Sequence, residues 1–105
     1  MQAIIVGSDP EDLAAALEAH DVTVTNAAGT ADRSSLLDAG VEDADLLAVT
    51  DVGLATSIPV ARELNPDVRV VVYARDSVPE FVRASTALIV DPALIDPDTV
   101  AEELA

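Results

Sequence analysis

The sequence predicts an α/β domain in which one five-stranded parallel sheet lies between two layers of helices. Short apolar runs rich in Val and Ile alternate along the chain with segments whose apolar residues repeat at helical spacing. This alternation is typical of βαβ units, which build a parallel sheet through right-handed crossovers. We expect the 105 residues to form one domain, residues 1–105, with a buried core. The predicted fold is a three-layer, Rossmann-like, doubly wound parallel sheet with the strand order 2-1-3-4-5.

The first half of the chain predicts three strands and two helices. We expect strands over residues 3–7, 22–25 and 45–49 and helices over residues 9–19 and 33–39. Leu13 and Leu17 lie one turn apart on the buried face of the first helix, and Pro10 suits its first turn. Gly40 follows the second helix, where a residue with left-handed backbone often ends a helix.

The second half predicts two further strands and three helices. We expect strands over residues 69–73 and 87–90 and helices over residues 54–64, 78–84 and from residue 96 onward. Pro59 forbids one backbone hydrogen bond, so the helix that contains it is either kinked there or begins later, near Ser57. Ser77 and Glu80 have the spacing of a capping box. Asp96 precedes a proline and is expected to cap the last helix.

The charge of the chain is strongly one-sided. Asp and Glu together number 20, Lys and Arg together number 5, all of them Arg, and the formal net charge is -15. Carboxylates repel one another strongly in dilute buffer and weakly at molar salt, where the Debye length falls to about 3 Å. Because 50% of the residues are hydrophobic, the chain should nevertheless fold. The composition is typical of a halophilic, acidic protein, and we expect its thermal stability to rise from dilute to molar KCl.

Residue content argues against several classes of function. Nucleic-acid binding needs a basic stripe, and the five arginines are scattered. The absence of Cys excludes disulfides, thiolate nucleophiles and Cys-based metal sites. The early first strand leaves no place for a signal peptide, and no apolar run suits a membrane span, so we expect a cytoplasmic protein. His20 is alone and no Ser has a paired base, so we do not expect an enzyme.

The carboxyl ends of the strands are where a doubly wound sheet binds its ligands. The residues expected to line this crevice are Gly7, Ser8, Asp9, Thr50 and Asp51, with Asn26 at the end of the second strand. Asp76 and Asp91 follow the next two strands, and oxygen ligands arranged in this way could hold Mg²⁺ or Ca²⁺. The arrangement also resembles a phospho-acceptor receiver domain, which is expected to use a lysine that this chain lacks. We favour helix caps and a halophilic surface as the explanation of these acids, and therefore expect no metal site.

Four stretches of the sequence share a family resemblance. They read IIVGSDPEDL (residues 4–13), AGVEDADLLAVTD (39–51), RELNPDVRVVVYARD (62–76) and STALIVDP (85–92). Together they resemble the N-terminal domain of potassium-transport regulators, the RCK or TrkA-N family. That resemblance implies a Rossmann fold that dimerises, binds a dinucleotide or an adenine nucleotide, and reports to a channel or transporter. The chain departs from the family in a much shorter connection between residues 25 and 32 and in having no second ligand-binding domain.

The glycine-rich turn of that family is altered here. A G-x-G-x-x-G turn brings the backbone amides of a helix start close to a pyrophosphate. Only Gly7 remains, since Asp9 and Asp12 stand at the second and third glycine positions and Pro10 removes an amide donor. Ser8 or Asp9 can cap the helix instead, so carboxylates would lie where the family holds phosphate. We therefore expect a self-capped structural turn that disfavours a diphosphate.

These observations lead to two functional hypotheses. The first is a non-catalytic, stand-alone regulatory or interaction module without competent dinucleotide binding. It would form a homodimer through the terminal helix that opens at Pro97 and through Ala-rich helix faces, and would contact a protein partner. The alternative is a sensor that binds NAD(H) or an adenine nucleotide in the crevice through Asn26, Thr50 and Asp51. Asn26 stands where the family places a ribose-binding acid.

Overall fold

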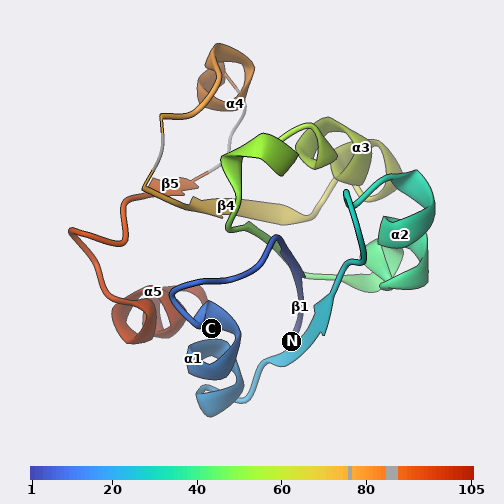
Figure 1. Ribbon diagram of the computed structural model, residues 1–105. Coiled ribbons are helices and arrows are strands. Elements are labelled where there is room, and N and C mark those ends of the chain that lie inside the picture. The colour runs from blue at the N-terminus through green and yellow to red at the C-terminus, as the bar shows by residue number, and fades with distance from the viewer. Residues whose placement is uncertain (76, 85–87) are drawn as a thin grey trace.

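Five parallel strands form one sheet in the order β2-β1-β3-β4-β5 in the computed structural model, which describes residues 1–75, 77–84 and 88–105 (Figure 1). The strands are β1 (Gln2–Val6), β2 (Thr23–Asn26), β3 (Leu46–Val49), β4 (Arg69–Tyr73) and β5 (Leu88–Val90). The helices are α1 (Leu13–Ala19), α2 (Arg33–Asp38), α3 (Ser57–Leu64), α4 (Glu80–Ala84) and α5 (Pro97–Leu104), with short 3-10 turns η1 (Val41–Asp43) and η2 (Val52–Leu54). The predicted fold class and strand order are confirmed.

Helices cover both faces of the sheet, because successive side chains of a strand point to opposite faces and the inner strands are apolar on both. On one face, α1 and α5 lie side by side, and on the other face lie α2, α3 and α4 (Figure 1). The strand residues buried on the α2–α4 side are Ile4, Val6, Leu47, Val49, Val70 and Val72. Those buried on the α1–α5 side are Ala3, Ile5, Leu46, Ala48, Val71 and Tyr73. Strands that bury both faces read as continuous apolar runs, which is how β1, β3 and β4 were found in the sequence.

The first helix begins later than predicted. It starts at Leu13 and not at residue 9, because Asp9 and Asp12 adopt left-handed backbone with φ angles of 53° and 57°. The N–H of Asp12 donates to the carbonyl of Asp9 at 3.1 Å, which closes a turn ahead of the helix. Pro10 therefore lies in this turn and not in the first turn of the helix. Leu13 and Leu17 are fully buried as predicted.

The remaining helix boundaries settle the open alternatives. Helix α3 begins at Ser57, so Pro59 is its third residue, where a backbone N–H would have no partner within the helix. Helix α4 begins at Glu80, so Ser77 does not stand at its capping position. Asp96 caps α5 as predicted, since its side chain accepts from the N–H of Thr99 at 2.8 Å. The first residue of the predicted strand 87–90 lies outside the described residues. None of the helices in the described part of the chain is long and apolar enough to cross a membrane.

Candidate functional site

Gly7 is the point where the first strand meets the third at the carboxyl edge of the sheet. Its φ angle is +116°, a backbone conformation that side-chain-bearing residues rarely adopt. A Cβ atom at this position would lie 2.5 Å from Oγ1 of Thr50 and 3.0 Å from Cβ of Asp51. The first glycine of the turn is therefore retained for a packing reason that does not depend on a ligand.

Thr50 ties the turn after β1 to the end of β3. Its hydroxyl donates to the carbonyl of Val6 at 3.2 Å and accepts from the N–H of Asp9 at 3.0 Å. Its own N–H donates to the same carbonyl of Val6 at 2.8 Å. Because Thr50 is buried and its hydroxyl is engaged on both sides, its role in the described structure is to hold the turn.

Asp9 fills the amino end of α1 with its own carboxylate. Oδ1 accepts from the N–H of Leu13 at 2.8 Å, and Oδ2 accepts from the N–H of Ala14 at 2.9 Å. Both oxygens thus bind amides that an α-helix leaves free at its start, and the negative charge lies at the positive end of the helix dipole. These are the groups that a phosphate would use in a nucleotide-binding turn. The turn is therefore capped by a side chain of its own, as predicted, and the capping residue is Asp9 and not Ser8.

The other predicted site residues are more loosely placed. Asp51 is exposed, and its carboxylate accepts from the N–H of Gly53 at 2.9 Å, which starts the turn η2. Ser8 and Asn26 are both exposed. Asn26 ends β2 and is paired in register with Ile5, on the opposite side of β1 from β3. The structure therefore brings Gly7, Asp9, Thr50 and Asp51 into one connected group and leaves Asn26 at the neighbouring strand.

A small crevice opens beside this group, at the carboxyl ends of the strands. It has a volume of about 240 Å³ and is lined by Pro10, Glu11, Thr50, Tyr73, Ala74, Arg75 and Pro92. Small-molecule sites typically occupy roughly 300–1,000 Å³, so the crevice is below the size of a usual ligand pocket. A dinucleotide would have to lie largely outside it.

An ion pair crosses the mouth of the crevice. Nη2 and Nε of Arg75 lie 3.0 Å and 3.1 Å from Oε1 of Glu11. The arginine nearest to the expected position of an anionic ligand is thus engaged by the chain's own carboxylate. No local signal identifies Glu11, since 64 residues separate the two partners.

Tyr73, the last residue of β4, also lines the crevice. It is buried, and its hydroxyl donates to the carbonyl of Ile95 at 2.7 Å, which links β4 to the loop before α5. Burial raises the pKa of the Tyr73 phenol, and the negative charge of Glu11 raises it further. The phenol is therefore held neutral as a hydrogen-bond donor.

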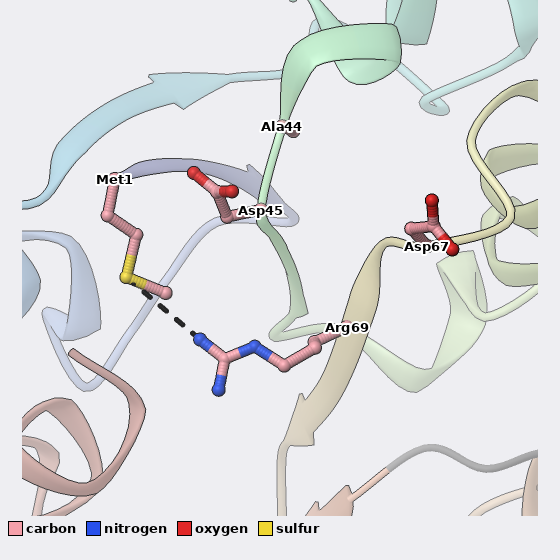
Figure 2. Close-up of a pocket in the computed structure, with 5 residues that line it drawn as sticks. All are labelled: Met1, Ala44, Asp45, Asp67 and Arg69. Carbon is pink, nitrogen blue, oxygen red and sulfur yellow. Dashed lines mark hydrogen bonds between the residues drawn. The ribbon is translucent and has the colours of Figure 1, made fainter.

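A cavity larger than this crevice lies at the opposite, amino-terminal edge of the sheet. It has a volume of about 510 Å³ and is lined by Met1, Ala44, Asp45, Asp67 and Arg69 (Figure 2). Figure 2 shows Met1 and Arg69 pointing toward each other, with Sδ 4.0 Å from Nη2. The same nitrogen donates to the carbonyl of Leu104 at 2.8 Å, and Asp45 accepts from the N–H of Gln2 at 2.8 Å. These polar groups serve the chain itself, and ligands of parallel sheets bind at the other edge.

The acids at the carboxyl edge do not converge on a common point in the described structure. Asp91 accepts from the N–H of Ala93 at 2.9 Å within its own turn. Asp76 lies outside the described residues. Across residues 1–75, 77–84 and 88–105, no group of three or more His, Cys, Asp and Glu side chains is arranged to hold a metal ion.

Two solved structures share this fold. One is a protein from Burkholderia pseudomallei described as pilus assembly-related, with 17% sequence identity, a TM-score of 0.65, and coverage of 99% of this chain and 86% of that chain. The other is described as a pilus assembly protein, CpaE, from Burkholderia thailandensis, with the same identity and TM-score and coverage of 99% of this chain and 94% of that chain. At this identity the likeness shows the fold alone. Residues 3–104 match a protein-family model described as a family of unknown function, DUF7126. No curated protein matches the sequence.

Proposed function

Because this chain belongs to the DUF7126 family of unknown function, we propose its role from the site itself: a non-catalytic regulatory module that works through protein contacts. In this proposal the domain is a stand-alone relative of the potassium-regulator nucleotide domain. It acts in the cytoplasm at high salt and has lost dinucleotide binding at its first crossover turn. The stretches 39–51 and 62–76, which carry the resemblance to that family, contain β3 and β4, two of the three inner strands.

The observation that carries the proposal is the Asp9 cap. A bound diphosphate would need the amides of Leu13 and Ala14, and the Asp9 carboxylate already accepts from both. It would also place its charge next to Asp9, and Glu11 stands close by at the crevice. Molar salt screens charges at a distance but leaves the competition for two specific N–H groups unchanged.

The second candidate is a sensor for NAD(H) or an adenine nucleotide. The exposed side chains of Asn26 and Asp51 favour it, because both lie at the edge of the sheet where a ribose would be bound. Such a ligand would have to bind without the helix start, through its sugar and base. The two pilus assembly-related proteins that share the fold favour the first candidate, in which the domain serves a larger assembly.

Titration calorimetry in molar KCl with ATP, AMP, NADH and NAD separates the two candidates. We expect dissociation constants of millimolar or weaker for the wild-type chain. Asp9→Gly frees the two amides, suits the left-handed backbone of this position and removes one charge, so we expect tighter binding of the phosphate-bearing ligands. Asp32→Gly is the matched control, because it removes the equivalent cap of α2, whose residues do not line the crevice. Micromolar binding by the wild-type chain would refute the proposed function.

A further inference from the structure

Most of the exposed large apolar side chains of the described residues gather at one edge of the sheet. They are Leu88, Ile89, Leu94 and Ile95, on β5 and in the loop that follows it, which we call the β5 edge surface, whereas Phe81 lies on α4 and Met1 and Leu37 lie elsewhere. Leu94 is 83% exposed, more than any other large apolar residue of the described chain. A monomeric domain normally scatters such residues singly, so a cluster at one edge indicates a contact surface.

The β5 edge surface includes an open sheet edge. Strand β5 pairs only with β4 and ends the sheet, so one row of its backbone groups faces away from the sheet. Figure 1 shows β5 at the outer side of the sheet, with α4 on one side of it and α5 on the other. An edge strand of this kind is a template for pairing with another strand.

A groove next to β5 adds apolar surface. It lies between β5 and α5, has a volume of about 330 Å³, and is lined by Leu88, Val90, Ile95, Thr99, Val100, Glu103 and Leu104. Glu103 is its one charged lining residue. Next to the groove, in the loop between β5 and α5, stands Leu94, so the surface carries both a projecting side chain and a hollow that accepts one.

We propose that two copies of this chain join through their β5 edge surfaces around a two-fold axis, with β5 pairing antiparallel to its counterpart. This proposal rests on the proposed role as an interaction module and names its partner and its surface. A two-fold contact uses the same patch on both copies, so the patch must complement itself. The backbone of a strand edge can pair with the same edge of the second copy, and the projecting Leu94 of each copy matches the shape of the apolar groove of the other.

The charges of the region also complement themselves. Helix α4 carries Glu80 in its first turn and Arg83 in its last turn, and both are exposed. Two antiparallel copies set Glu80 of one against Arg83 of the partner, twice. With a net charge of -15 on each copy, most other faces would repel each other.

A dimer of ordinary strength needs only a small part of the surface of this chain. A standard interface takes about 800 Å² from each partner, which is about one seventh of the 5453 Å² surface of this chain. Because the remaining charges repel at long range, the dimer should form more strongly as KCl rises.

Sedimentation equilibrium of the full chain in molar KCl tests the proposal. We expect a mass of twice the 10.8 kDa monomer for the wild type. Leu94→Glu should weaken the dimer about tenfold or more, since it buries an unpaired charge. Leu37→Glu is the matched control with the same charge change on α2, and it should leave the dimer intact. Circular dichroism verifies that both variants are folded.

A charge exchange gives a second, independent readout. At the lowest KCl concentration at which the wild type is still a folded dimer, Arg83→Glu alone should weaken the dimer, because it sets two acids against each other, and Glu80→Arg with Arg83→Glu should restore it. A wild-type monomer in molar KCl, equal effects of the two leucine variants, or no restoration in the exchanged variant would overturn the proposal. Calorimetry with nucleotides is read separately, so a dimer that binds NAD refutes the proposed function and leaves the β5 contact standing.

Discussion

Replacing Gly7 by Ala should destabilise the domain more than any other single methyl addition at its glycines. The φ angle of +116° is strained for any residue with a side chain, at a cost of about 1–3 kcal/mol. The new Cβ would lie 2.5 Å from Oγ1 of Thr50, so this hydroxyl has to move. Its two hydrogen bonds, to Val6 and from Asp9, contribute about 1 kcal/mol each. The expected loss is therefore about 3–5 kcal/mol, against a total stability of about 5–15 kcal/mol for a typical domain.

Gly40→Ala is the matched control for this loss. Gly40 also has a positive φ angle, +85°, but no atom lies within 4 Å of the position that its new methyl group would take. It should therefore show the backbone strain alone, about 1–2 kcal/mol. Urea unfolding in molar KCl, followed by circular dichroism, gives both values, and equal slopes would show that the unfolded state is unchanged.

A double-mutant cycle isolates the contact with Thr50. In a Thr50→Ala background the hydroxyl is absent, so Gly7→Ala should cost about 1–3 kcal/mol less than in the wild type. Two results would contradict this contact: an equal cost of Gly7→Ala and Gly40→Ala, or a cost of Gly7→Ala that does not depend on Thr50. Either result would mean that the turn is not packed against the end of β3 in the way described.

Three further predictions concern titration and salt. Tyr73 is the single tyrosine of the chain, and its pKa is raised by burial and, to a smaller extent, by the charge of Glu11. Its phenolate absorbance should therefore appear above the ordinary midpoint of about 10, and Glu11→Gln should move this midpoint down. The neutral phenol stabilises the fold below that pH, and this stabilisation is lost as the pH rises. Hydrogen bonds from Thr99 lower the pKa of Asp96, so wild type and Asp96→Asn should differ in stability at neutral pH and converge as the pH falls below about 4; a constant difference would contradict this. Thermal unfolding should shift upward from dilute to molar KCl, and a flat dependence would refute the halophilic interpretation.

The fold could be predicted because its signals are local. Residues 69–73 form a continuous Val-rich run that is buried on both faces, and the strand found there has the predicted bounds. The start of α1 could not be predicted in the same way. Asp-Pro-Glu-Asp has the composition of a first helical turn, and only the left-handed backbone of Asp9 and Asp12 moves the start to Leu13. Residue type indicates that an Asp caps, but the backbone decides which amides it reaches.

The candidate site was predicted in part. Gly7, Asp9, Thr50 and Asp51 follow two strands that lie next to each other, so the strand order alone brings them together. The Glu11–Arg75 pair depends on where two loops end in space, which no local pattern encodes. The comparisons support the Rossmann-like sheet, and the relation to potassium regulators stays a prediction.

The apolar face of the terminal helix, which the sequence suggested as a dimer surface, lies inside the domain. Val100, Ala101 and Leu104 of the terminal helix are buried in the domain's own core, and α5 packs on α1, so its apolar face is not free to contact a second copy as the sequence suggested. The apolar residues left uncovered come from β5 and its flanking segments. The predicted strand order placed β5 last in the sheet, but the sequence did not show that its side chains would stay uncovered.

The Asp9 cap and the β5 edge surface have a common physical consequence. In a nucleotide-binding turn the ligand's phosphate completes the helix start, so binding stabilises the fold and can be sensed. Here the Asp9 carboxylate completes it permanently, so this turn should be equally ordered with and without a ligand. For the regulatory role proposed above, the signal would therefore have to come through another surface. The β5 edge, where apolar side chains and open backbone groups coincide, is one such surface of the described chain.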